Sequence, residues 1–494
     1  LGAQRPAEDA LLGVLPARRL TREDLAVRAD RWDTRMTLPA VEGLLKDPLA
    51  VTGALSSWSD RMKDASSPAG LAELAIGLLD AQPVAESSEA AKAMLTEWES
   101  PLNGPPSGLS EEAHSAIGLI LSAVAAAGPL LEKAVSSLSP EERERALAVM
   151  RGLVLNEDHG RVASGDFDLM ARFDHSSLLS AALQVMASVD EALPALRNAS
   201  SQAAGLPRTR LRLPIGDVLL SGGGEDDYSE QDLAGAVLLV DFGGKSRYLG
   251  PAGAAGEGEV RVVIDLSPEV RVESSSGAAS GVFGIGLLYL PQEGGAKTLR
   301  AGDVSLGAGL FGTGGLFLAG DGSSLESGRF TQGAGAFGLG ILDSLGQGST
   351  FFLRLAGQGF GSTRGAGLLR HRGDGAVLDG GRTEPDPREP LAALSLSQGV
   401  GYGPRAFAAG GVGLALVEGD GCRLQASYMA QGMGYWHSFG GLSVVGNGAR
   451  IQGRRYVQGA GVHTALGGMR LNGNGNSMTA WGVGPGFGWD YGVG

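Results

Sequence analysis

The stretch Gln431-Gly432-Met433-Gly434 is one copy of a phrase, Gln-Gly-Xaa-Gly, that recurs through the last third of the chain. Its copies begin at Gln332, Gln358, Gln398, Gln431 and Gln458, and an altered copy begins at Pro485. These starting positions are 26, 40, 33, 27 and 27 residues apart. A phrase repeated at such intervals is typical of a solenoid, in which each turn of the chain buries its apolar face only against its neighbours.

The glycine content divides the chain in two. Only 14 of the 82 glycines precede residue 210, and alanine, leucine and glutamate dominate that first part. The change in composition predicts a hinge at 203–207, between an α-helical module at 1–205 and a glycine-rich repeat domain at 206–494. A chain of 494 residues is long enough for two or three domains.

Short apolar runs bounded by glycine follow one another through the repeat domain. They include 236–240, 260–264, 286–290, 315–318 and 340–342. Runs of this length suit the strands of a solenoid core, and glycine at the bends permits tight turns between them. We therefore expect an all-β C-terminal domain, folded as a right-handed parallel β-helix. Its length corresponds to about ten or eleven turns stacked roughly 4.8 Å apart.

The repeated glutamines predict a ladder at one corner of the solenoid. Stacked side chains of this type satisfy each other's amide donors and acceptors. The expected ladder consists of Gln332, Gln358, Gln398, Gln431 and Gln458. The alternative is a row of amides that binds a ligand.

The first 200 residues are predicted to form amphipathic helices. One is expected to begin at Thr21, which is followed by two acidic residues, and another at Ser139-Pro140. Further helices are expected at 69–81, 87–99, 110–127 and 176–198. A helical module beside a solenoid is expected to cap an open end or to dock a partner.

The aromatic and imidazole side chains of the helical module indicate packing rather than chemistry. Trp32, Trp58 and Trp98 are expected to anchor the packing between helices, with an aromatic ligand pocket as the alternative. Three histidines are scattered through the module: His114, His159 and His175. None is spaced as a helical metal-binding pair.

Composition excludes several classes of protein. The net charge of −14 argues against a nucleic-acid partner, because phosphate contacts need clustered Lys and Arg. The single cysteine, Cys422, excludes an internal disulfide framework. The longest apolar run, 116–131, is short for a bilayer span, so no transmembrane segment is predicted. The first residue is Leu1 rather than Met, which indicates either that a leader has been removed, as export would require, or that the chain has been shortened.

Several turns of the repeat domain share Gly, Asp and Tyr. Residues 222–228 read Gly-Gly-Gly-Glu-Asp-Asp-Tyr, and 239–248 read Leu-Val-Asp-Phe-Gly-Gly-Lys-Ser-Arg-Tyr. They resemble eroded copies of Leu-Leu-x-Asp-x-Gly-Gly-x-Asp-x-Tyr, a repeat of secreted bacterial β-solenoid proteins. The resemblance covers roughly 216–494, and it implies a bacterial protein that is periplasmic, extracellular or on the outer surface.

The same turns are similar to the calcium-binding turns of toxin-type β-rolls. Calcium takes six to eight oxygen ligands, whereas most of the acids are replaced here by Gly, Ser or Asn. A continuous calcium ladder is therefore not expected, and no cofactor is predicted. One residual calcium site around Asp226 and Asp227 stays open as the alternative.

Stacking of the Gln-Gly phrases aligns the residues that follow each glutamine. The residues four positions after the first residue of a phrase include Tyr402, Tyr435, Val462 and Trp489. Close behind stand Arg364, Arg405, Trp436, His437, His463 and Asp490. Two histidines one turn apart suit acid–base or metal chemistry, and an aromatic row beside basic groups suits carbohydrate. The alternative is an aromatic stack that closes the last turns.

The long interval between Gln358 and Gln398 contains an insertion, 379–388, that is rich in proline and charge. Insertions in repeat proteins emerge as loops on one face, which is often the binding face. We expect this loop to be a contact element rather than a catalytic one.

Together these features favour a scaffold or accessory subunit of a bacterial envelope or extracellular assembly, which acts by contacting other proteins. The alternative is a carbohydrate-binding or carbohydrate-active β-helix. Its catalytic candidates are Tyr435, His437, His463 and Asp490, and its binding candidates are Arg364, Arg405, Tyr402, Trp436 and Trp489. The sequence has no serine-nucleophile, phosphate-loop or zinc-helix motif, so a non-enzymatic role is favoured.

Overall fold

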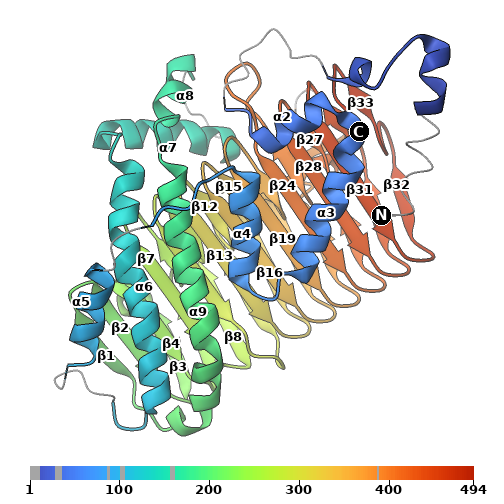
Figure 1. Cartoon of the computed structure of the whole chain (residues 1–494). Coiled ribbons are helices and arrows are strands. Elements are labelled where there is room, and N and C mark those ends of the chain that lie inside the picture. The colour runs from blue at the N-terminus through green and yellow to red at the C-terminus, as the bar shows by residue number, and fades with distance from the viewer. Residues whose placement is uncertain (1–11, 28–35, 86–88, 101–105, 156–161, 387–388) are drawn as a thin grey trace.

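The computed structural model of the chain describes residues 12–27, 36–85, 89–100, 106–155, 162–386 and 389–494. Leu1, Trp32, His159 and residues 387–388 of the insertion lie outside the described residues. A helical region is followed by a parallel β-solenoid, and Figure 1 shows the helices along the flank of the solenoid.

The helical region contains both α-helices and short 3-10 turns. The α-helices are α2 (Pro39–Lys46), α3 (Val51–Asp64), α4 (Pro68–Leu78), α5 (Glu89–Trp98), α6 (Glu111–Val135), α7 (Pro140–Leu155), α8 (Ser164–Met170) and α9 (His175–Ala203). The 3-10 turns are η1 (Pro16–Arg18), η2 (Glu23–Leu25) and η3 (Pro48–Ala50). The helices predicted at Ser139-Pro140 and in the four further segments are confirmed.

The helix predicted to begin at Thr21 is wrong, because only the three-residue η2 forms there. The backbone N–H of Thr21 donates to the carboxylate of Asp24 at 2.8 Å, which closes a single turn rather than starting a helix.

Helix α6 lies between α5 and α9. It is long and apolar enough to cross a membrane, but 67% of its apolar window is buried, and it packs against α5 and α9. Trp98 of α5 stacks on His114 of α6 at 4.4 Å and donates its Nε1–H to the carbonyl of His114. The expectation that Trp98 anchors two helices is confirmed.

The solenoid is built from three sheets, and successive turns add strands to each. Sheet A contains β1 (Thr209–Leu213), β2 (Gly216–Ser221), β4 (Ala236–Asp241), β7 (Val260–Asp265), β10 (Ile285–Leu290), β13 (Thr313–Ala319), β16 (Leu339–Leu345), β19 (Ala366–Arg372), β24 (Val412–Glu418), β28 (Phe439–Val445) and β31 (Leu466–Asn472). Sheet C contains β6 (Ala254–Ala255), β9 (Ser280–Val282), β12 (Ala308–Leu310), β15 (Ala334–Ala336), β18 (Phe360–Gly361), β23 (Val400–Tyr402), β27 (Gly434–Tyr435), β30 (Gly461–Val462) and β33 (Gly488–Trp489).

Sheet B lies opposite sheet A and carries the insertion. Its main path contains β3 (Glu225–Ser229), β5 (Lys245–Leu249), β8 (Glu269–Ser274), β11 (Lys297–Ala301), β14 (Ser324–Thr331), β17 (Thr350–Gly357), β20 (Val377–Asp379), β25 (Arg423–Gln425), β29 (Arg450–Gly453) and β32 (Ser477–Ala480). Three short strands lie off this path: β21 (Glu384–Pro385), β22 (Ala393–Ser397) and β26 (Tyr428–Ala430). A short helix, α10 (Glu230–Leu233), follows β3.

The parallel β-helix is confirmed, and its right-handed sense stays a prediction. The stack holds about nine turns rather than the ten or eleven expected. The difference arises because the interval from Gln358 to Gln398 adds the insertion instead of a further turn, and sheet C starts only at β6. Strand β1 pairs antiparallel with β2 and covers the first edge of sheet A.

Sheet A is buried on both faces. In β10, Leu288 and Leu290 belong to the core between sheets A and B, whereas Leu287 and Tyr289 belong to a core that also includes the helices. Successive side chains of a strand point to opposite faces. A strand covered on both faces needs apolar residues throughout, which explains the continuous apolar runs in the sequence.

Sheets A and C approach each other backbone to backbone. A Cβ on Gly335 of β15 would lie 2.1 Å from the carbonyl oxygen of Ala366 in β19. A Cβ on Gly340 of β16 would lie equally close, 2.1 Å, to the carbonyl oxygen of Ala334. The glycines of the Gln-Gly-Xaa-Gly phrase are therefore required by this close approach as well as by the bend.

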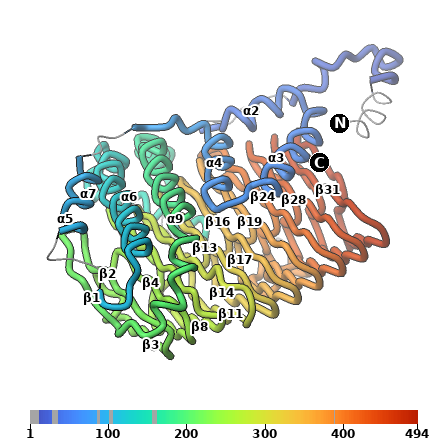
Figure 2. The backbone as a smooth tube through the Cα atoms, turned by 60° about the horizontal axis from the view of Figure 1, so that its bottom comes forward, coloured from blue at the N-terminus to red at the C-terminus, as the bar shows by residue number. Residues whose placement is uncertain are grey.

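The helical region does not cap an end of the solenoid, contrary to that expectation. It covers the outward face of sheet A, as Figures 1 and 2 show from two directions. Trp58 of α3 packs edge-on against Phe439 of β28 at 4.8 Å, so this tryptophan anchors a helix to the solenoid. Phe173 likewise packs against Phe311 at 5.5 Å. The apolar outward face of sheet A requires this cover.

Candidate functional site

The aromatic row expected at the corner after sheet C forms. Tyr402 of β23 pairs in register with Tyr435 of β27. Tyr435 in turn pairs with Val462 of β30, and Val462 pairs with Trp489 of β33. The rings of Tyr402 and Tyr435 stack with 5.3 Å between centroids and 12° between planes. Both tyrosines are half-buried, and the Trp489 side chain is exposed.

His463 joins this row to two charged side chains. Its Nδ1 contacts the carboxylate of Asp490, and its Nε2 lies 3.1 Å from Nη1 of Arg405. Because a guanidinium group can only donate, Nε2 accepts from Arg405 and the Nδ1 proton goes to Asp490. The lone pair that a general base needs is therefore already engaged.

Tyr435, Trp436 and His437 occupy different sides of the same corner. The ring of Tyr435 packs edge-on against His463 at 5.2 Å, and the guanidinium of Arg405 lies 5.5 Å from the ring centre of Trp436. His437 is buried, and its backbone N–H donates to Thr464. The register thus aligns His463 with Trp436, so the two histidines do not share one position of the stack.

Arg364 lies apart from this cluster. Its Nη1 donates to the carbonyl of Ala171, which follows helix α8, at 3.4 Å. Burial lowers the pKa of its guanidinium. The structure therefore brings Tyr402, Arg405, Tyr435, His463 and Asp490 together and leaves Arg364 in the contact between the helices and the solenoid.

The five glutamines lie inside the corner between sheets B and C. All five are buried and have a positive φ, which a bend at this corner demands. Nε2 of Gln358 donates to Oε1 of Gln332, and Nε2 of Gln431 donates to Oε1 of Gln398, each at 3.1 Å. The other bonds run from Gln332 to the hydroxyl of Ser327 at 2.9 Å and to backbone carbonyls of sheet B, for example from Gln458 to Thr479 at 3.0 Å. The amides therefore hold the corner together.

The Asp and Tyr of the degenerate repeat meet in the first turns of the solenoid. The hydroxyl of Tyr228 donates to Asp241 at 2.7 Å, and that of Tyr248 donates to Asp265 at 2.8 Å. Burial, followed by the charge of the neighbouring Asp265, raises the pKa of Asp241 to about 8. Burial also raises the pKa of Asp265. The repeat residues thus form a hydrogen-bonded stack inside the solenoid, in which burial raises the pKa of both carboxyl groups.

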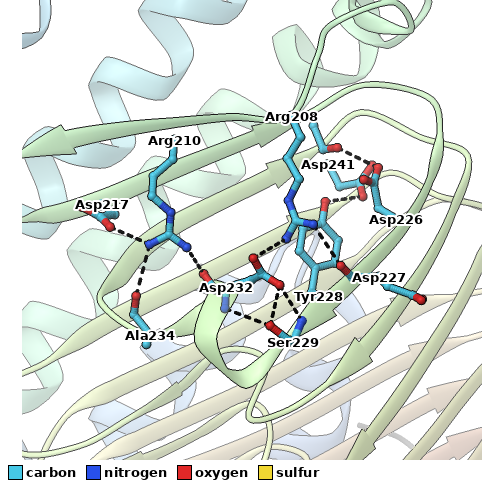
Figure 3. Close-up of polar contacts among 11 residues, drawn as sticks. Arg208, Arg210, Asp217, Asp226, Asp227, Tyr228, Ser229, Asp232, Ala234 and Asp241 are labelled. Carbon is cyan, nitrogen blue, oxygen red and sulfur yellow. Dashed lines mark hydrogen bonds and ion pairs between the residues drawn. The ribbon is translucent and has the colours of Figure 1, made fainter.

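Asp226 and Asp227, the calcium candidates, lie at the edge of this network (Figure 3). Asp226 accepts a hydrogen bond from Ser221 at 2.7 Å, and Arg208 donates to the backbone carbonyl of Asp227 at 2.9 Å. The Arg208 guanidinium also lies 4.4 Å from the ring centre of Tyr228. In the part of the chain that the structure describes, no group of three or more His, Cys, Asp or Glu could hold a metal ion.

Sequence reasoning missed a buried ion pair between the helices and sheet A. The side chain of Arg370 in β19 is 1% exposed and pairs with Asp343 of β16, which also contacts Arg372 at 3.2 Å. The available signal was a pair of arginines, 370 and 372, at the end of an apolar strand. Because side chains two residues apart in a strand point to the same face, both arginines lie on the outward face of sheet A, under the helices.

Sequence reasoning also missed a groove of about 520 Å³ beside the insertion. Arg382 of the insertion and Leu391, which follows it, line this groove, and Gln425 and Gln452 on the outward face of sheet B form its floor. Arg454 and Trp481 from the last turns also line it, and Arg454 contacts the backbone carbonyl of Leu391. The insertion alone predicted a contact loop, but only the folded chain brings the last turns beside it.

Comparison with known proteins identifies no relative: no family model, no curated protein and no solved structure matches this chain. The fold itself places the chain among the β-solenoid proteins, here with helices docked along one sheet.

Proposed function

We propose that the chain is a scaffold or accessory subunit of a bacterial envelope or extracellular assembly, and that it binds another protein through the last turn of the solenoid. The support comes from three exposed side chains, Met478, Trp489 and Tyr491, which we call the terminal face. Their exposed fractions are 43%, 56% and 61%. The exported setting follows from the resemblance of the turns to secreted solenoid repeats.

The chemistry of the terminal face suits a protein partner. Tryptophan and tyrosine are enriched in the energetic centres of protein interfaces. Among the described residues, β32 and β33 each pair with a strand of the preceding turn on one side only.

A carbohydrate-active enzyme at the His463 corner is less well supported. Arg405 engages Nε2 of His463, and Asp490 engages Nδ1. Neither nitrogen is left to accept or deliver a proton for a substrate. These contacts stabilise the corner rather than prepare it for catalysis.

The test is co-purification from the source organism followed by native mass spectrometry. The wild-type chain is expected to carry a stoichiometric partner protein, which a Trp489→Ala/Tyr491→Ala double variant loses. Leu249→Ala, at an exposed leucine in the first turns, is the matched control and is expected to retain the partner.

Two results would contradict the proposal. One is a partner that the double variant and the control retain equally. The other is a wild-type chain without a partner protein, and in that case self-association that the double variant abolishes would assign the terminal face to contacts between copies.

A further inference from the structure

The groove between the insertion and sheet B carries chemistry that the proposed scaffold role does not use. We infer that this groove binds an acidic oligosaccharide, that is, an extended chain of uronic-acid sugars. The site is separate from the terminal face, and its residues can be changed independently. The inference rests on the floor, the walls and the charge of the groove.

The floor of the groove is a row of polar side chains on parallel strands. Gln425 of β25 and Gln452 of β29 both line the groove, and register aligns them on neighbouring strands. Neighbouring strands lie about 4.8 Å apart, so the amides recur at that interval across the floor. Each amide offers donors and an acceptor, which is the set that sugar hydroxyls need.

The walls add a flat aromatic surface. Trp481 is 66% exposed and lines the groove together with Leu391, which is 81% exposed. An indole combines a broad apolar face with a single N–H donor. It can therefore cover the apolar face of a sugar ring while the floor amides bind the hydroxyls.

The charge of the groove selects an anion. Arg382 and Arg454 line it, and no Asp or Glu is among its described lining residues, although the chain carries a net charge of −14. Arg382 pairs with Asp379 at 2.6 Å. Arg454 contacts the carbonyl of Leu391, and within the described ranges no carboxylate lies close enough to pair with it. A planar guanidinium suits a carboxylate ligand.

A sugar fits this groove better than a peptide does. An extended peptide gains most by adding a strand to a free sheet edge, and the floor here is a sheet face whose strands are already paired. Hydroxyl-rich rings with a carboxylate use the amides, the indole and the guanidinium together.

Isothermal titration calorimetry on the full chain tests the inference. The probes are a tetragalacturonate and maltotetraose, a neutral oligosaccharide with the same number of rings. The tetragalacturonate is expected to bind saturably at millimolar concentration and much more tightly than maltotetraose. Arg454→Gln is expected to weaken the tetragalacturonate about tenfold or more, and Trp481→Ala is expected to weaken both sugars.

The control variant is Arg300→Gln, which removes an exposed arginine from the outward side of sheet B outside the groove. It is expected to bind like the wild type, and thermal melting of each variant checks that the fold is retained. Three results would overturn the inference: no saturable binding of tetragalacturonate, equal binding by the groove variants and the control, or tighter groove-dependent binding of a hexaglutamate peptide. The last result would assign the groove to an acidic protein segment.

Discussion

Arg370 of β19 and Asp343 of β16 form a two-pronged ion pair beneath the helices, with Nε–Oδ1 and Nη2–Oδ2 distances of 2.8 and 2.7 Å. The same guanidinium donates from Nη1 to the carbonyl oxygens of Met62 and Ala65, each at 2.6 Å, where α3 ends. A cation at the C-terminus of a helix is favourable. One buried side chain therefore joins two strands of the solenoid to a helix more than 300 residues earlier in the chain.

Replacing Arg370 is expected to destabilise the protein strongly. Arg370→Met leaves the buried Asp343 with a single partner and the α3 carbonyls unpaired, which is expected to cost about 3–5 kcal/mol in the free energy of unfolding. Urea denaturation measures this loss. Arg372→Met, at a more exposed arginine of the same cluster, is the control and is expected to cost less. Equal losses in the two variants would contradict the assigned role.

The glutamine ladder is expected to contribute to stability through hydrogen bonds. Gln431→Ala removes the donors to Gln398 and to the backbone carbonyl of Gln452. Buried acceptors left unpaired cost about 1–3 kcal/mol, so the urea midpoint should fall accordingly. Gln347→Ala, at an exposed turn, is expected to change it little. A ladder that acts only in ligand binding would leave both midpoints unchanged.

The contact between sheets A and C is expected to reject any side chain at Gly335. In Gly335→Ala the new Cβ meets the carbonyl oxygen of Ala366 at 2.1 Å, and overpacking of this kind costs about 1–3 kcal/mol or more. Gly77→Ala is the control, because its Cβ meets nothing within 4 Å and alanine favours the helix. Thermal melting should show opposite shifts, and a stable Gly335→Ala would show that the sheets can separate.

The buried Asp241 carboxyl is expected to make stability depend on pH. Burial and Asp265 raise its pKa to about 8 in the folded chain, against about 4 when unfolded. The folded state therefore holds a proton that the unfolded state releases. The resulting stabilisation is complete below about pH 4 and is lost as pH rises towards about 8.

Asp241→Asn tests this dependence because asparagine cannot ionise. Urea midpoints measured from pH 5 to pH 8 are expected to fall less steeply in this variant than in the wild type. Asp321→Asn, at an exposed turn, serves as the control and should follow the wild type. A variant with an unchanged pH slope would show that Asp241 is already ionised in the folded protein.

The repeat pattern was sufficient to predict the strands of sheet A and the aromatic row. The strands at 236–240 and 260–264 form as expected, and Tyr402 aligns with Tyr435. These features depend on residues one turn apart, whose pairing repeats along the stack. The approach of His463 to Asp490 was also accessible, because their offsets after the Gln-Gly phrase are equal.

Other features were beyond a repeat argument. In the stack, His437 aligns with Thr464 and not with His463, so the two histidines differ by one position. Each of the two turns bends here through two consecutive residues of positive φ, and this bend sets the direction of each side chain. The groove is lined by both the insertion and Trp481, although about 90 residues of chain separate them. Neither arrangement leaves a periodic signal.

The sequence by itself determined that this protein is a β-solenoid with glutamine corners, because stacking of successive turns is a local rule repeated many times. Only the tertiary structure decided that the helices cover sheet A instead of an end, that Arg370 ties them to Asp343, and that the last turns complete a groove. These contacts join segments far apart in the chain. They depend on shape and charge that become complementary only after each part has folded.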